Sequence, residues 1–314
     1  MGFFLVRRLV GFIATLIAAT LVVFLVLEVL PGDPAQVMLG VDAQPEQVRR
    51  LHAELGLDRP AGLRYLAWVG GLARGDLGTS YTYDVPVAEL VGERLAVTVP
   101  LALLAMALTT VLALGLGVYA AAHRDGPGDV GIMMLSQLGI AVPNFWFAIL
   151  LVLVFAVKLA WFPSGGFPGW DSGFGAALKS LLLPAIALAV VQAAILTRIT
   201  RSAIIDLLAE DFVRTARAKG NSRSRALWRH VLRNALIPIV TIMGLQFSSL
   251  LAGTIIVENV FTLPGLGRLV FQAITQHDLI VIQDVVVLLA ALVIVINFAV
   301  DLLYLAIDPR LRAR

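Results

Sequence analysis

Six apolar stretches constrain what this chain can fold into more than any other feature. A transmembrane helix needs about 17–25 mostly apolar residues, and backbone groups inside lipid must be hydrogen-bonded within the segment, which favours helices. The stretches cover residues 9–30, 96–122, 130–157, 181–197, 235–257 and 281–307, and the third is interrupted at Pro143-Asn144. The sequence therefore predicts an all-α polytopic membrane protein with six transmembrane helices.

The composition agrees with a membrane protein and excludes several kinds of chemistry. Hydrophobic residues make up 59% and charged residues 14% of the chain, whereas a soluble domain has about 25% charged residues. The chain has no cysteine, so a disulfide, a thiolate ligand and a cysteine nucleophile are excluded.

Motifs of common catalytic and metal sites are missing from the sequence. Lysine occurs only as Lys158, Lys179 and Lys219, and none follows a glycine, which excludes the Gly-Lys pair of an ATP-binding P-loop. The four histidines are scattered, without the spacing of a zinc protease, and no G-x-S-x-G nucleophile elbow occurs. We therefore expect no catalytic residue, no metal site and no nucleic-acid partner.

Basic residues gather in alternate connections between the apolar stretches. They lie at Arg7-Arg8, at His123-Arg124, in residues 198–234 and in the tail at 308–314. Because cytoplasmic loops carry the excess of Lys and Arg, we expect these segments and both termini in the cytoplasm. A cleaved signal peptide has an apolar region of about 7–15 residues, so the longer first stretch predicts an uncleaved transmembrane helix.

These assignments divide the chain into four parts. The parts are a first transmembrane helix at 1–30, an extracytoplasmic insert at 31–95, a transmembrane domain of five helices at 96–307 with a cytoplasmic loop at 198–234, and a cytoplasmic tail at 308–314. Short helices are expected in the insert at 47–55 and 63–72, but it has too few apolar residues for a large core of its own. We expect the insert to pack on the membrane domain or on an external partner. Further outer loops are expected at 161–171 and 258–278.

Residues 211–238 form the one long polar and basic segment between apolar stretches. The pattern predicts a helix over 203–218, a turn at Gly220-Asn221, where both residues tolerate positive φ, and a second helix over 224–236. A helix–glycine–helix elbow rich in arginine could seat in a groove of a partner protein. The alternative is a loop that only touches anionic lipid headgroups.

Polar side chains within the apolar stretches are candidates for lining a translocation pathway, because polar groups inside a membrane are often functional. The candidates are Asn144, Gln192, Gln246 and Ser249, of which the last two cluster in the middle of one stretch. The alternative for each is a hydrogen bond between neighbouring helices, which Asn, Gln and Ser often supply in membranes.

The central segment, DFVRTARAKGNSRSRALWRHVLRNALIP, resembles the cytoplasmic coupling loop of ABC importer permeases, in the peptide and nickel branch. The general importer signature is E-A-A, three residues, Gly, nine residues, I-x-L-P. Gly220 and Ala216 match the signature. The positions that depart from it are Arg214, Thr215, His230 and Arg233, and these departures are shared by the peptide and nickel branch, where TARAKG and RHxLRNA are typical.

Further blocks of the chain are similar to segments of this family, in the same order along the sequence. They are LPGDPA at 30–35, LGLDRP at 55–60, RGDLGTS at 74–80, ENVFTLPGLGRL at 258–269 and DLLYLAIDPRLR at 301–312. Together with the central segment, they extend the resemblance over nearly the whole chain.

The resemblance implies a type I ABC importer transmembrane fold in the prokaryotic plasma (inner) membrane. The chain would be a permease subunit that forms half of the pathway for a peptide-like solute, a di- or oligopeptide or glutathione. Its implied partners, besides membrane lipid, are a second homologous permease, two cytoplasmic ATPase subunits and an extracytoplasmic substrate-binding protein. ATP and magnesium would bind to the ATPase partners, so this chain would hold no cofactor and would not itself be an enzyme.

The resemblance also implies roles for residues of the loop. Contact with the ATPase is assigned to Thr215, Ala216, Ala218, Lys219 and Gly220, with Arg217 and Arg223 at the rim of the contact, while His230, Arg233 and Asn234 fasten the loop to the rest of the domain.

Other functions stay open at this point. One is a permease for nickel or another metal chelate. A second is a stand-alone secondary transporter, although no internal repeat supports an inverted-repeat architecture. A third is an intramembrane enzyme, for which the sequence offers no nucleophile or metal constellation.

Overall fold

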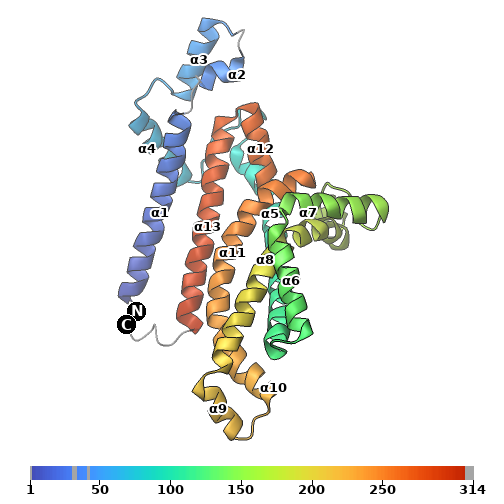
Figure 1. The fold of residues 1–314 in the computed structure, drawn as a ribbon. Helices are drawn as coiled ribbons and strands as arrows, with labels where there is room; N and C mark the ends of the chain where they lie inside the picture. The colour runs from blue at the N-terminus through green and yellow to red at the C-terminus, as the bar shows by residue number, and fades with distance from the viewer. Residues whose placement is uncertain (1, 30–33, 41–42, 308–314) are drawn as a thin grey trace. The chain divides into compact units, whose positions relative to one another are not determined.

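The computed structural model describes residues 2–29, 34–40 and 43–307, and these residues form helices and no β-strand (Figure 1). The α-helices are α1 (Gly2–Val29), α2 (Pro34–Leu39), α3 (Pro45–Leu55), α4 (Ala61–Leu72), α5 (Val87–Ala122), α6 (Pro127–Ala141), α7 (Asn144–Leu151), α8 (Phe174–Leu208), α9 (Asp211–Ala218), α10 (Arg223–Ala226), α11 (Leu232–Val260), α12 (Leu266–Gln276) and α13 (Leu279–Ile307). Two π-helical segments, η1 (Val152–Lys158) and η3 (Leu227–Val231), continue α7 and α10, and η2 (Trp170–Ser172) is a 3-10 turn. The all-α prediction is confirmed, while the predicted tail at 308–314 lies outside the described residues.

The number of helices able to cross a membrane agrees with the prediction. Among the described residues, five helices are long and apolar enough, and a sixth span results if the bent pair of α6 and α7 with η1 counts as one. That pair bends by 102° at the break. Pro143 explains the bend, because proline disfavours helical backbone at the preceding Val142, which has φ −85° and ψ 122°.

Several helix boundaries differ from the expected ones. The predicted continuous helix over 203–218 is wrong, since α8 ends at Leu208 and α9 begins at Asp211. Glu210 between them is extended, with φ −72° and ψ 149°, and Asp211 places a negative charge at the start of α9, where the helix dipole favours it. The expected outer loop at 258–278 contains a helix, α12, over more than half its length.

Contacts within the chain divide it into two compact units. Among the described residues, unit 1 comprises Val99–Leu263 and 296–307, and unit 2 comprises Gly2–Thr98 and Pro264–Val295. Helices α5 and α13 therefore each contribute residues to both units.

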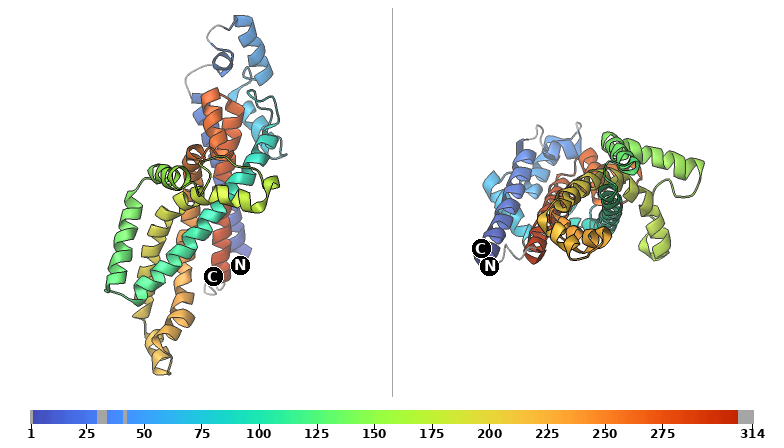
Figure 2. Two further views of the ribbon diagram at one scale, coloured as in Figure 1. Left: turned by 90° about the vertical axis from the view of Figure 1, so that its right-hand side faces the viewer. Right: turned by 60° about the horizontal axis from the view of Figure 1, so that its bottom comes forward.

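In unit 1, α8 is the central helix and packs against α6, α7 and α11 (Figure 2). Small residues permit the close approach of its neighbours, as is common for helices inside membranes. A Cβ atom added to Gly117 of α5 would lie 2.6 Å from the Cβ of Thr200 on α8. The crossing of α5 and α8 therefore depends on glycine at this position.

In unit 2, the start of α5 packs with α12 and α13 around an apolar cluster that includes Val87, Leu269 and Val285. Asp278 ties the connection before α5 to this cluster, because its carboxylate accepts hydrogen bonds from Ser80 Oγ (2.6 Å) and from the backbone N–H of Thr82 (3.1 Å). Helix α4 of the predicted insert packs on α1. Leu77, Tyr83 and Val85 of the insert pack against the same apolar cluster, whereas Leu63 and Leu66 of α4 stay exposed.

Candidate functional site

The polar segment between α8 and α11 forms the elbow, which we define as residues 209–231. It consists of α9, a turn, α10 and η3, and Figure 1 shows α9 and α10 projecting beyond the ends of α6 and α8. The elbow joins α11 without a break, so that residues 223–260 form one long helix. The predicted second helix over 224–236 lies inside this helix, with a π-helical turn at Leu227–Val231.

The turn of the elbow has the hydrogen bonds of a Schellman motif. Gly220 has φ +88°, its N–H donates to the carbonyl of Arg217 (2.9 Å), and the N–H of Asn221 donates to the carbonyl of Ala216 (3.3 Å). The side-chain amide of Asn221 donates to the same carbonyl at 3.1 Å. The predicted turn at Gly220-Asn221 is confirmed, and glycine is favoured there because other residues are strained at positive φ.

The helix after the turn begins at a serine cap. The hydroxyl of Ser222 accepts a hydrogen bond from the N–H of Arg225 at 3.3 Å, which satisfies one of the unpaired N–H groups at a helix start. Local hydrogen bonds therefore end α9 and begin α10.

The inner face of the elbow is apolar and buried. Val213 of α9 is 3% exposed, and it belongs to one cluster with Leu227 and Val231. The same cluster includes Val118 near the end of α5 and Ile204 near the end of α8. A displacement of the elbow would therefore move the ends of these helices, because close-packed side chains transmit strain.

The outer face of the elbow carries most of the residues assigned to a partner contact. Thr215, Arg217, Ala218, Lys219 and Gly220 are exposed, whereas Ala216 is 8% exposed and lies on the inner face. A Cβ atom added to Gly220 would have nothing within 4 Å among the described residues. The outer face therefore presents the positive charges of Arg217 and Lys219 beside the backbone of Gly220, which no side chain of the described residues covers.

Arg223 makes a contact that the sequence does not reveal. Its Nη2 donates to the carbonyl of Ala122, the last residue of α5, at 3.3 Å. Arginine near the end of a helix can satisfy one of the free carbonyls there. Arg223 therefore connects the elbow to α5, although the sequence does not identify which helix end would receive it.

The residues expected to fasten the loop lie at the start of α11 and the preceding π turn. His230 is half-buried, and Arg233 and Asn234 are exposed. Asn234 Nδ2 donates to the carbonyl of His230 at 2.8 Å, a bond within the same helix.

The structure contains a buried ion pair between α6 and α8 that was not predicted from the sequence. The guanidinium of Arg201 donates from Nε to Asp129 Oδ1 (2.5 Å) and from Nη2 to Asp129 Oδ2 (2.6 Å). Asp129 is 2% exposed and also accepts from the N–H of Asp125 at 2.9 Å. In the sequence, Asp129 and Arg201 belong to two separate charged connections between apolar stretches. Their pairing could not be predicted, because it depends on the packing of α6 on α8.

The structure brings together two of the four pathway candidates. Gln246 Nε2 donates to the carbonyl of Gln192 at 2.9 Å, so that both lie buried between α8 and α11. Gln246 Oε1 and Asn144 Oδ1 are buried without a hydrogen-bond partner among the described residues. Ser249 is exposed, so it lies apart from this buried group.

Comparison of the chain with known protein families gives two matches, which together cover nearly its whole length. The model described as binding-protein-dependent transport system inner membrane component matches residues 113–313. A second model, for the N-terminal part of such membrane components, matches residues 1–102.

Curated relatives are similar to the chain over nearly their full length. A putative peptide transport system permease protein of Brucella abortus is 44% identical, with 98% of each chain covered. The oligopeptide transport system permease protein AppB of Bacillus subtilis is 38% identical, covering 99% of each chain. The glutathione transport system permease protein GsiC of Escherichia coli is 38% identical, covering 98% of each chain.

Solved structures support the fold. A chain of the MetNI methionine ABC transporter, in an inward-facing conformation, matches with a TM-score of 0.57 and 19% identity. The match covers 70% of this chain and 96% of the MetNI chain, and it confirms the expected type I importer fold. The chain therefore belongs to the family of inner membrane components of binding-protein-dependent transport systems.

Proposed function

We propose that this chain is the permease subunit of an ATP-driven importer and forms half of the translocation pathway for a peptide-like solute. The relatives at 38–44% identity are named for peptide, oligopeptide and glutathione transport. A di- or oligopeptide, or glutathione, is therefore the solute class that we favour over a nickel or other metal chelate.

The observation that carries this proposal is the two-faced construction of the elbow. Its inner face is packed with the ends of α5 and α8, while its outer face exposes Arg217, Lys219 and the open backbone at Gly220. A loop that only touched lipid headgroups would need the positive charge but not the capped turn and the packed inner face. We propose that the outer face docks into a groove of a cytoplasmic ATPase, and that residues 211–234 pass its motion to the helices.

The remaining partners complete a transport cycle. We propose that a second homologous permease supplies the other half of the pathway, that two ATPase subunits bind ATP and magnesium, and that an external binding protein delivers the solute. This chain holds no cofactor and performs no covalent chemistry. We propose that both termini and the elbow lie in the cytoplasm, because the basic residues gather in these segments.

We propose that the translocation pathway runs along polar side chains inside the membrane-spanning helices. The candidate residues are Gln192 and Gln246, which are buried between α8 and α11, together with Asn144 of α7 and the exposed Ser249 of α11. Buried amide oxygens without partners, such as Gln246 Oε1, could accept hydrogen bonds from a passing peptide backbone when the helices separate.

Substitutions at Gly220 test the coupling role. We compare Gly220→Asn, which tolerates positive φ, with Gly220→Val, which does not and which places a branched side chain on the outer face. In the complete transporter reconstituted into vesicles, Asn should keep most uptake, whereas Val should lower solute uptake per ATP hydrolysed by about tenfold, equal to about 1.4 kcal/mol of coupling free energy.

The controls separate coupling from folding. Membrane insertion should be similar for both variants. Valine should cost about 1–2 kcal/mol of stability because of the positive φ at this position, although no neighbour within 4 Å among the described residues would clash with it, so uptake per ATP is compared at equal amounts of folded permease. Wild-type uptake per ATP in the valine variant would contradict the coupling role. Solute flux from the purified single chain, without any ATPase, would instead support a stand-alone transporter.

A further inference from the structure

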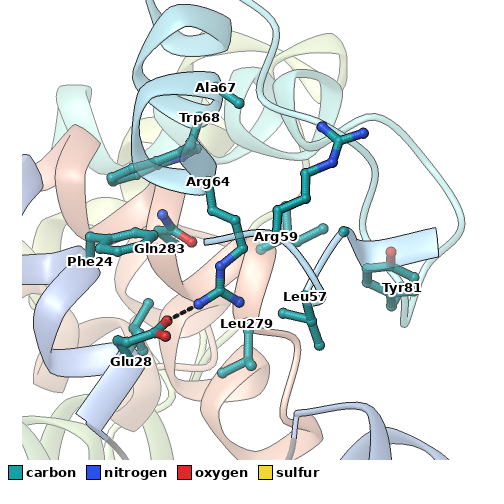
Figure 3. Close-up of a pocket in the computed structure, with 13 residues that line it drawn as sticks. Phe24, Glu28, Leu57, Arg59, Arg64, Ala67, Trp68, Tyr81, Leu279 and Gln283 are labelled. Atoms are coloured by element: carbon teal, nitrogen blue, oxygen red, sulfur yellow. Dashed lines mark hydrogen bonds and ion pairs between the residues drawn. The ribbon is translucent and has the colours of Figure 1, made fainter. Parts of the chain in front are cut away.

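Unit 2 contains a cavity of about 320 Å³ beside the end of α1, and the proposed pathway does not use it (Figure 3). Its lining combines aromatic and aliphatic side chains with charged ones. The rings of Phe24 and Trp68 stack with their centroids 6.3 Å apart. Arg59, Arg64 and Glu28 supply the charges.

The charges of the cavity are only partly used within the protein. Arg64 Nη2 forms an ion pair with Glu28 Oε2, while Arg64 Nε is buried without a hydrogen-bond partner among the described residues. Arg59 is exposed, and the described residues give its side chain no ion pair. Figure 3 shows its guanidinium directed away from the Arg64–Glu28 pair. The cavity thus offers donors for an anion beside an acceptor for a cation.

The position of the cavity along the helices places it at the level of lipid headgroups. Two helices that could cross a membrane, Val6–Val29 and Leu279–Val300, have their ends here. Glu28 lies one residue before the end of the first, and Leu279 is the first residue of the second. Aromatic rings such as that of Trp68 are typical of the membrane–water interface.

The apolar lining of the cavity continues onto a surface that lipid would cover. Only 6% of the most apolar part of α1 is buried. Leu21, Leu25 and Val29 of α1 are exposed by 42%, 48% and 79%. Acyl chains lying along this face would have their headgroup at the level of Glu28.

We propose that this cavity binds the headgroup of a zwitterionic phospholipid with a primary amine, of the phosphatidylethanolamine type. Arg64 would hold the phosphate, and the exposed side chain of Arg59 would turn toward the cavity to join it, because arginine matches phosphate geometry and forms charge-assisted hydrogen bonds. Glu28 would accept a hydrogen bond from the ammonium. The site is independent of the solute that the transporter carries.

The charge pattern selects among lipid classes. A headgroup with phosphate alone would satisfy the arginines but leave Glu28 beside a second negative charge. Phosphatidylcholine has both charges, but its quaternary ammonium cannot donate a hydrogen bond to Glu28. Phosphatidylethanolamine is therefore expected to bind more tightly than phosphatidylglycerol or phosphatidylcholine.

Native mass spectrometry of the full-length protein, released from nanodiscs containing the three lipids in equal amounts, tests this proposal. Wild type should retain phosphatidylethanolamine preferentially. Arg59→Gln should weaken that retention by about tenfold, in line with loss of one charge-assisted hydrogen bond. Arg59 is exposed and unpaired among the described residues, so this variant should fold normally. Arg50→Gln, an exposed arginine of α3, is the matched control and should retain lipid as wild type does.

Glu28→Gln tests the second half of the site. It should abolish the preference for phosphatidylethanolamine over phosphatidylglycerol while leaving total lipid retention unchanged. Equal retention of all three lipids by wild type, or an Arg59→Gln variant that behaves like Arg50→Gln, would overturn the proposal. Displacement of the lipid by a soluble dipeptide, but not by soluble glycerophosphoethanolamine, would also overturn it and mark the cavity as a solute site.

Discussion

Helices α1 and α8 are both apolar enough to cross a membrane, yet they have opposite surroundings within their own units. In α8, 72% of the most apolar part is buried inside the protein, whereas in α1 the share is 6%. Of the two, α1 is the more apolar. Apolar character therefore identifies a span but does not distinguish a lipid-facing helix from one at the centre of a bundle.

The side chains of the two helices explain the difference. Buried positions of α8 are mostly small, among them Ala185, Ala189 and Ala193, which allow neighbouring helices to approach. The middle of α1 instead exposes larger side chains, such as Val22 and Leu25. In lipid, apolar surface gives no driving force between helices, so close packing of small residues decides which helix is central.

The largest expected difference concerns the ion pairs of the two helices. Asp129, paired with Arg201 of α8, is 3% exposed in its side chain, whereas Glu28 of α1, paired with Arg64, is 39% exposed. Removing one partner of a buried pair leaves an uncompensated charge, so Asp129→Ala should lower the free energy of unfolding by about 3–5 kcal/mol. Glu28→Ala should lower it by under about 1 kcal/mol.

Denaturation of the purified full-length protein in a mild detergent measures both changes. The double variant Asp129→Ala with Arg201→Met removes both charges and should recover part of the lost stability. Equal losses for Asp129→Ala and Glu28→Ala would show that burial does not separate these pairs.

A smaller difference is expected from shortening one leucine in each helix. Leu188 of α8 is fully buried and Leu25 of α1 is 48% exposed. Leu188→Ala should reduce the free energy of unfolding by about 2–4 kcal/mol, because the packed surroundings leave a cavity. Leu25→Ala should change it by less than about 0.5 kcal/mol, since lipid or detergent fills the space. The same denaturation assay compares them, and a larger loss for Leu25→Ala would contradict the lipid-facing assignment of α1.

Local patterns in the sequence were sufficient to predict the number of spans and the turn of the elbow. The turn at Gly220-Asn221 could be predicted because its geometry depends on neighbouring residues, which the Schellman bonds to Arg217 and Ala216 confirm. The break before Asp211 was missed, although Glu210-Asp211 is a signal for a helix start. Helix α12 was not predicted, because the whole segment 258–278 was assigned to an outer loop.

Contacts between distant parts of the sequence could not be predicted in the same way. The pairing of Asp129 with Arg201 and the bond from Arg223 to the carbonyl of Ala122 each join residues about 70–100 positions apart. Any basic residue of the loop could satisfy a carboxylate or a helix end by charge alone. Only the packing of α5, α6 and α8 selects the partners.

The smallest predicted change in the free energy of unfolding comes from replacing a glycine by alanine. The change is a loss at Gly117, which faces α8, and a gain at Gly11 of α1. Gly117 of α5 faces α8, where an added Cβ would lie 2.6 Å from Thr200 Cβ and 3.0 Å from the carbonyl of Thr197. Real Cβ atoms do not approach so closely, so Gly117→Ala must separate α5 from α8. We expect a loss of about 1–2 kcal/mol in the free energy of unfolding.

Gly11 of α1 has nothing within 4 Å of an added Cβ atom. Alanine forms helices more readily than glycine, by about 0.5–1 kcal/mol, so Gly11→Ala should raise stability slightly. Gly115→Ala is a second control, because this residue lies in α5 two positions from Gly117 and also faces open space. Stability that falls in Gly117→Ala but not in the two controls would assign the loss to the helix crossing. A similar gain in all three variants would mean that α5 and α8 do not cross at this glycine.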